Sequence, residues 1–318
     1  RHKLPMSGDV DSIDGTTRLL VEQARTVLDH AQGETDQPVA LLGHSMATDI
    51  LARLALEAEG VGPLVLLSAR SQVITGKEPD NLLIVTGAWE PGLVEFAENA
   101  LWMVDAEAGL GQTATRDGIT RRAVLAPYAD HVSILFSRAG RAEALGWLNR
   151  YYDRDATPHV WPSGWALLGL LAALAALFYP VSRLLSSGLD RPPRLTPSAF
   201  AVAVVPPMVI TPLVAVLVEL SFLPALVVDY LVVHLALYGV ILGGLLLWIR
   251  PAPRRPDLAA AILLGGWAVF VFGMALDRYG ANFWPTGERL ALMGALCVGA
   301  IPFMLADSWL AYVAPLWQ

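Results

Sequence analysis

The pattern of hydrophobic positions divides the chain into two unlike parts. An amphipathic stretch from Thr16 to Ala31 repeats apolar residues at three- and four-residue spacing, which predicts a helix with one buried face. Four short apolar runs without alternation follow, at 38–42, 63–67, 82–85 and 123–126. Runs of this kind are typical of strands that are buried on both faces of a parallel sheet.

Helical patterns separate and follow these strands. They cover residues 46–59, 93–105 and 132–151. Because buried strands alternate with helices, the first half is predicted to be an α/β domain with a mostly parallel sheet and flanking helices. We place this domain at residues 1–155 and a linker at 156–164.

The second half contains apolar segments of membrane length. About 20 apolar residues in a helix cross the roughly 30 Å hydrocarbon core of a bilayer. Five segments approach or exceed this length, at 165–181, 199–218, 223–249, 258–276 and 290–306. Residues 165–318 are therefore predicted to form an all-α transmembrane domain of five helices, with a sixth left open after Trp309.

The arginines predict the orientation of these helices, because cytoplasmic loops carry an excess of basic residues. Arginine follows the first and third segments, at Arg183, Arg191, Arg194, Arg250, Arg254 and Arg255. The loops at 219–222 and 277–289 carry no net positive charge and are placed outside. Counting back across the first segment puts residues 1–160 on the extracytoplasmic face.

Composition and charge narrow the class of protein. Of 318 residues 55% are hydrophobic and 16% are charged, which is too apolar for a wholly soluble protein. Residues 1–160 hold 14 basic and 22 acidic side chains, and residues 161–318 hold 8 and 7. Neither half supplies the clustered basic surface that binds phosphates, so nucleic acid is excluded as a partner. The lipid bilayer is the partner that the composition predicts.

Two residue counts bear on source and chemistry. Arginine outnumbers lysine 20 to 2, which is typical of a GC-rich bacterial source, so we expect a bacterial inner membrane protein. The one cysteine, Cys297, lies in an apolar run and can form neither a disulfide framework nor a thiolate metal site. We expect no metal ion and no cofactor.

Directly after the first predicted strand the chain reads Gly43-His44-Ser45-Met46-Ala47, and a predicted helix follows. A sharp turn between a strand and a helix is the setting in which a G-x-S-x-G sequence exposes a nucleophilic serine. Ala47 replaces the second glycine and adds one methyl group to a crowded turn. His44 is interpreted as a turn residue or as a wall on the substrate side.

The stretch from Val39 to Met46 resembles the α/β-hydrolase fold family, and so does the order of the later turns along the chain. The resemblance implies a nucleophile, an acid and a histidine, each after a successive strand. Here it places Ser45, Glu90 and His131 in those positions, Glu90 in Thr86-Gly87-Ala88-Trp89-Glu90-Pro91 and His131 in Tyr128-Ala129-Asp130-His131-Val132-Ser133. It also implies an oxyanion hole built from the backbone N–H of Met46 and a second N–H from an early strand, which we expect to precede residue 1.

These residue types suit acyl chemistry. A serine hydroxyl is a weak nucleophile at neutral pH, so His131 would accept its proton while a carboxylate orients the imidazole. Glu90 is favoured over Asp130 as that carboxylate, because neighbouring side chains on a turn rarely face each other. Ordinary structural roles remain the alternative: Ser45 as a helix cap, Glu90 as a turn residue and His131 as a surface histidine.

The favoured interpretation is a membrane-anchored serine hydrolase that cleaves an ester or related acyl bond through an acyl-enzyme. Its substrate would be a small-molecule or lipid acyl compound, including an acylated envelope component. Only residues 71–81 separate the second and third predicted strands, which leaves no room there for a helical lid. An acyltransferase with the same three residues and a non-catalytic binding or sensing module remain the alternatives.

Overall fold

The computed structural model describes residues 12–155, 160–184, 194–218, 223–225, 227–249, 251, 258–279, 284–285 and 287–315. Its contacts separate an α/β unit, Thr16–Gly169, from a helical unit built on Leu170–Gln318. The predicted linker at 156–164 lies partly outside the described residues, and its last residues belong to the α/β unit.

The α/β unit contains a five-stranded sheet with the strand order β1-β2-β3-β5-β4. The strands are β1 Val39–His44, β2 Val61–Leu67, β3 Asn81–Gly87, β4 Thr113–Arg116 and β5 Ile119–Ala126. β1, β2, β3 and β5 run parallel, and β4 pairs antiparallel with β5. The prediction of a mostly parallel sheet is therefore confirmed.

β4 was not predicted, because it is short and three of its four side chains are exposed. The turn that joins it to β5 contains Asp117 and Gly118, both with positive φ. An Asp-Gly pair between two extended segments is a strong hairpin signal. The sequence therefore held a local signal for this hairpin, although the strand itself lacks an apolar pattern.

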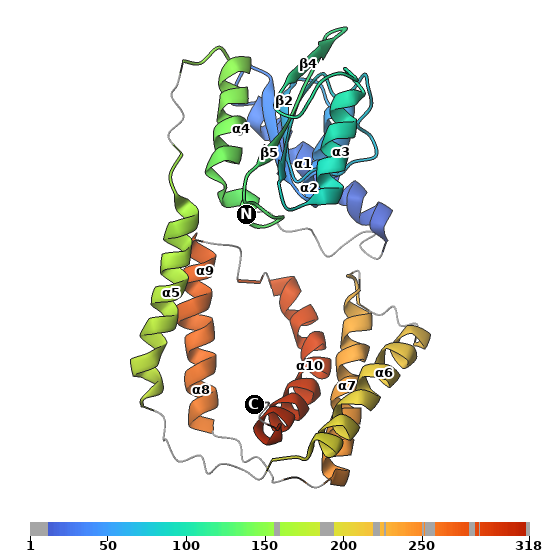
Figure 1. Cartoon of the computed structure of the whole chain (residues 1–318), viewed down its shortest axis with the longest axis vertical. Helices are drawn as coiled ribbons and strands as arrows, with labels where there is room; N and C mark the ends of the chain where they lie inside the picture. The colour runs from blue at the N-terminus through green and yellow to red at the C-terminus, as the bar shows by residue number, and fades with distance from the viewer. Residues whose placement is uncertain are drawn as a thin grey trace. The chain divides into compact units, whose positions relative to one another are not determined.

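Helices cover both faces of the sheet (Figure 1). They are α1 Ile13–Gln32, α2 Met46–Glu57, α3 Pro91–Trp102 and α4 Arg138–Tyr151, with a short 3₁₀ helix at Ser133–Phe136. The predicted single helix over 132–151 is wrong in one respect. Ser137 is extended and ends the 3₁₀ turn, and its side chain caps α4 by accepting a hydrogen bond from the Gly140 N–H.

Two buried clusters explain why the predicted strands lacked alternation. Alternate residues of the central strands point to opposite faces, so Leu64 and Ile84 pack with α1, α2 and α3. Val65 and Val85 pack on the other face with Trp147 of α4. Because both faces are covered, consecutive positions in the middle of β2 and β3, Leu64–Leu67 and Leu82–Val85, are all apolar.

Arg121 is a fully buried charged residue within β5. Its guanidinium donates to the carbonyl oxygens of Ala100, Thr75 and Glu78 at 2.7, 2.8 and 3.1 Å. Burial lowers the pKa of Arg121 to about 10, so the side chain stays charged at neutral pH. Arg121 thereby ties the connection between β2 and β3 to the end of α3.

We predict that Arg121→Met lowers the free energy of unfolding by about 3 kcal/mol or more, because three carbonyl groups lose their buried donor. Arg122→Met is the matched control, since Arg122 is less buried and its partner Glu143 is partly exposed. We expect that control to lose about 1 kcal/mol. Urea unfolding followed by tryptophan fluorescence measures both losses, and equal losses would contradict the role assigned to Arg121.

The helical unit and the helix that enters it supply five helices that are long and apolar enough to cross a membrane. They are α5 Ser163–Ser182, α6 Pro197–Leu217, α7 Val228–Ile249, the continuous span Leu258–Tyr279 and α10 Gly287–Val313. The span Leu258–Tyr279 joins α8 Leu258–Gly266, a π-helical segment Trp267–Gly273 and α9 Met274–Tyr279. Each of the five predicted segments therefore contains one of these helices.

Three details of the membrane prediction change. α10 continues through Trp309 to Val313, so in the described part of the chain this segment extends the fifth helix and forms no sixth. α7 begins at Val228 rather than Leu223. Of the arginines that predict orientation, Arg191, Arg250, Arg254 and Arg255 lie outside the described residues, as does the loop at 219–222.

Small residues allow α7 and α10 to pack closely. A Cβ atom added to Gly239 would overlap the backbone of Pro302 and Phe303. One added to Gly299 would overlap the carbonyl group of Val232. Glycine at such positions lets the backbones of two helices approach, as is common in membrane helices.

Candidate active site

Ser45 occupies the turn between β1 and α2 in a backbone conformation that non-glycine residues rarely adopt. Its φ is 56° and its ψ is −126°. The turn is held by its neighbours, because the Ser45 N–H donates to Leu67 O at 3.1 Å, and Thr48 donates to Ser45 O from its N–H and from its hydroxyl. A strained conformation persists only where the surroundings enforce it. The Ser45 hydroxyl is thereby fixed at the carboxyl end of β1.

Gly43 is required at this turn. A Cβ atom at Gly43 would lie 3.0 Å from Ala47 O and 2.9 Å from Leu51 Cδ1. The methyl group of Ala47 is accommodated, half-buried, in the first turn of α2. The departure from a second glycine is therefore compatible with the sharp turn.

The structure brings Ser45, His131 and Glu90 together, although at least 40 residues lie between any two of them in the sequence. His131 Nε2 lies 2.7 Å from Ser45 Oγ, and His131 Nδ1 lies 2.6 Å from Glu90 Oε1. Ser45 stands at the N-cap position of α2, but its side chain makes no capping hydrogen bond. Its hydroxyl faces the imidazole instead.

The side chains of His131 and Glu90 differ in their exposure to solvent. The side chain of His131 is 47% exposed, whereas that of Glu90 is 7% exposed. An imidazole that is open to solvent on one side can meet a substrate. A buried carboxylate behind it interacts more strongly with an imidazolium than an exposed one would, because the surroundings screen less.

The carboxylate of Glu90 is held by two further donors. Its Oε2 accepts hydrogen bonds from Ser68 Oγ at 2.6 Å and from the Gly87 N–H at 2.9 Å. A Cβ atom at Gly87 would lie 2.8 Å from that same oxygen. One carboxylate oxygen is thus fixed by the protein, which leaves Oε1 for His131.

Sequence reasoning missed Ser68. This residue follows β2 directly, has a φ of 51° and is fully buried. The signal that could have found it is positional, because the carboxyl ends of parallel strands meet at one edge of a sheet. Residues that follow β1, β2, β3 and β5 therefore converge, and Ser68 is the member of this set that follows β2.

Asp130 is engaged within its own turn. Its Oδ1 accepts hydrogen bonds from the N–H groups of Val132 and Ser133 and from Ser133 Oγ. The hydrogen bonds from Ser133 and Val132 hold the pKa of Asp130 below its usual value. Asp130 caps the 3₁₀ turn, and Glu90 is the carboxylate that contacts His131.

His44 supports the backbone of His131. Its Nε2 lies 2.7 Å from His131 O and donates to it, and the two ring centroids are 4.9 Å apart. The sequence placed His44 in a turn or in a wall facing the substrate. In the structure His44 ends β1 directly before the serine turn, and its hydrogen bond links that turn to the histidine turn.

Met46 begins α2 directly after Ser45. The first N–H groups of a helix have no intrahelical acceptor and carry the positive end of the helix dipole. The Met46 N–H is therefore placed to stabilise a negative oxygen beside Ser45. Among the residues the structure describes, no three histidine, cysteine or acidic side chains gather as a metal site would require.

The lowered pKa of Asp130 predicts how the histidine turn responds to pH. A carboxylate whose pKa is depressed on folding stabilises the protein above its unfolded pKa, about 4, and loses that contribution as pH falls through the folded pKa. We expect Asp130→Asn to be less stable than the unsubstituted chain near neutral pH and to approach it in acid. Urea unfolding at both pH values measures this, and a stability difference that does not change with pH would contradict it.

Ser45, Glu90 and His131 lie in the turns that follow β1, β3 and β5, at one edge of the sheet. Their side chains form a continuous series of hydrogen bonds. These contacts are the observations on which a function can be assigned. Comparisons of the chain with protein-family models, with curated proteins and with solved structures gave no match.

Proposed function

We propose that this protein is a membrane-anchored serine hydrolase of the α/β-hydrolase fold family, which cleaves an ester or related acyl bond through an acyl-enzyme. One observation carries the proposal. Ser45 Oγ lies 2.7 Å from His131 Nε2, and His131 Nδ1 lies 2.6 Å from Glu90 Oε1. A nucleophile within hydrogen-bond reach of a base, which a third group orients, is the arrangement that activates a serine.

In the first half of the proposed reaction Ser45 Oγ attacks the acyl carbon while His131 Nε2 takes the hydroxyl proton. The negative oxygen of the tetrahedral intermediate accepts a hydrogen bond from the Met46 N–H. Glu90 stabilises the imidazolium and keeps the neutral ring protonated at Nδ1. His131 then gives its proton to the leaving oxygen as the carbon–oxygen bond breaks.

In the second half water attacks the acyl group on Ser45. His131 Nε2 takes one proton from the water, and its return to Ser45 Oγ releases the carboxylic acid and restores the serine. The exposed side of His131 gives water access to this step. Acyl transfer would use the same residues with another acceptor in place of water.

The surrounding hydrogen bonds support this assignment because they fix geometry before a substrate binds. Ser68 and Gly87 hold the Glu90 carboxylate, and His44 holds the carbonyl group of His131. Groups held in place need no reorganisation as charge develops in the transition state. We assign Ser68 and His44 as positioning residues.

The membrane anchor is the second part of the proposal. Five apolar helices are long enough to cross a membrane. The first of them, α5, begins in the α/β unit, and the other four follow it in the chain. We propose a bacterial inner membrane location with the hydrolase unit on the extracytoplasmic face, supported by arginines such as Arg183 and Arg194. The connection between β2 and β3 contains no helix, so it supplies no lid over the site.

Hydrolysis of p-nitrophenyl butyrate by the full chain in lipid nanodiscs tests the function. Ser45→Ala should abolish turnover, and Glu90→Gln should lower kcat by about 10⁴-fold, the scale expected when a triad carboxylate is neutralised. Asp130→Asn is the matched control and should stay within about threefold, because its side chain remains in its own turn.

A larger loss in Asp130→Asn than in Glu90→Gln would reverse the assignment of the acid. No turnover by the unsubstituted chain, on this ester or with added acyl acceptors, would favour a non-catalytic binding or sensing module. Turnover that requires an acceptor other than water would identify an acyltransferase.

A further inference from the structure

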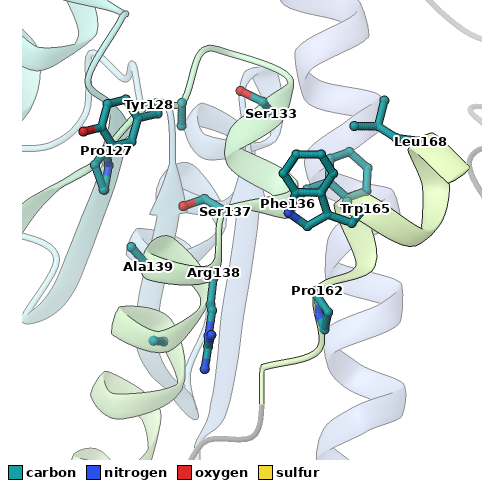
Figure 2. Close-up of a pocket in the computed structure, with 13 residues that line it drawn as sticks. Pro127, Tyr128, Ser133, Phe136, Ser137, Arg138, Ala139, Pro162, Trp165 and Leu168 are labelled. Carbon is teal, nitrogen blue, oxygen red and sulfur yellow. The ribbon is translucent and has the colours of Figure 1, made fainter.

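A pocket of about 750 Å³ adjoins the histidine turn within the α/β unit (Figure 2). This volume falls in the range of about 300–1,000 Å³ that is usual for small-molecule sites. One wall is formed by the histidine turn and the start of α4, from Pro127 to Ala142. The other wall is formed by Pro162 and the first turns of α5, up to Leu168.

The lining is mostly apolar and aromatic. Tyr128 is 81% exposed and Trp165 is 78% exposed, and both line the pocket. Figure 2 shows Tyr128 on one side and Trp165 and Leu168 on the other. Large apolar groups that remain open to solvent around a hollow indicate an apolar ligand.

The serine hydroxyls in the lining already have partners. Ser133 Oγ donates to Asp130, and Ser137 Oγ accepts from the Gly140 N–H. Among the lining residues Arg138 is the charged one, and its exposed guanidinium makes no hydrogen bond or ion pair with the described part of the chain. The pocket therefore offers a mainly apolar lining and one cation, which together complement an apolar chain that carries an anionic group.

The wall from α5 indicates where such a ligand would come from. α5 is long and apolar enough to cross a membrane, and its first turns are fixed to the α/β unit. Arg141 donates to Ser163 Oγ at 2.9 Å and to Trp161 O at 2.6 Å, and a Cβ atom at Gly164 would lie 3.0 Å from Phe136 Cβ. Tryptophans near the end of such a helix are typical of the membrane interface, so membrane lipids are the source of ligand that this wall suggests.

We propose that this pocket binds a long-chain fatty acid, with its chain between Tyr128 and Trp165 and its carboxylate at Arg138. The inference rests on the proposed function for the source of the ligand, because cleavage of a long-chain acyl ester at Ser45 releases this acid. It thereby names long-chain acyl esters as the substrate class. Tyr128 and Ser133 lie within three residues of His131, so the pocket and the base share one turn.

Photolabelling tests binding without any catalysis. The probe is palmitate that carries a diazirine on its chain, added to the full-length Ser45→Ala chain in nanodiscs, which cannot form an acyl-enzyme. We expect labels in peptides covering residues 127–142 and 160–168. Ala139→Trp, a change at an exposed lining position, should weaken labelling about tenfold, because a filled pocket no longer buries the methylene groups.

Leu145→Trp is the matched control, since Leu145 is exposed on the same helix and lies outside the lining. Its labelling should equal that of the Ser45→Ala parent. Arg138→Gln should weaken labelling about threefold, the effect of losing one solvent-exposed ion pair. Equal labelling of the Ala139→Trp and Leu145→Trp variants, or an Arg138→Gln variant that labels like its parent, would overturn the proposal.

Ester kinetics with Ser45 intact separate this inference from the proposed function. Ala139→Trp should lower kcat/KM for p-nitrophenyl palmitate about tenfold and leave that for p-nitrophenyl acetate unchanged, which also shows that the variant is folded. Labelling without turnover of any ester would support the pocket and overturn the hydrolase. Turnover with no labelling of the pocket peptides would support the hydrolase and overturn the pocket.

Discussion

The hydrogen bond between Glu90 and His131 is the contact on which the rest of the site depends. It joins the turn after β3 to the turn after β5. These turns lie close together because Gly87 pairs with Ala126, so that the two strands end at the same level of the sheet. His44 pairs with Leu67 in the same way across β1 and β2. The parallel sheet thus aligns the ends of its strands, and the residues that follow these ends meet.

The turns that bring these residues together at one edge of the sheet contain strained backbone conformations, which neighbouring hydrogen bonds stabilise. Ser45, Ser68 and Tyr128 all have positive φ, between 51° and 56°, and all follow strand ends. Each such residue is destabilised by about 1–3 kcal/mol relative to a relaxed backbone. The hydrogen bonds of Ser45 with Leu67 and of Ser68 with Val85 hold two of these conformations in place. Strain that gathers around one set of side chains supports a functional site there rather than a set of ordinary turns.

The elements that could be predicted from the sequence are those whose burial requires a recognisable pattern of apolar residues. β2 and β3 stand out as continuous apolar runs because both of their faces are covered, and the membrane-length helices stand out because they are uniformly apolar. β4 lacked any such pattern, and the break at Ser137 depends on a capping hydrogen bond that periodicity does not record.

In the candidate site, some residues are recognisable from the local sequence, whereas others are recognisable only from contacts in three dimensions. Ser45, Glu90 and His131 could be predicted because each follows a strand in a recognisable turn. Ser68 and His44 could not be assigned their contacts, because these depend on the distance between strand ends and on ring orientation. The lining of the pocket beside the histidine turn is likewise a property of packing between Pro127–Ala142 and Pro162–Leu168, which sequence spacing does not show.

Covalent labelling by a fluorophosphonate tests the central claim, the activation of Ser45, most directly. A phosphonate centre reacts with a serine that has a positioned base and oxyanion donor, and ordinary serines do not react. With the full chain in lipid, mass spectrometry should find the adduct on Ser45, absent in Ser45→Ala and strongly reduced in His131→Ala. An unsubstituted chain without an adduct on Ser45, or an adduct that His131→Ala leaves unchanged, would contradict the account.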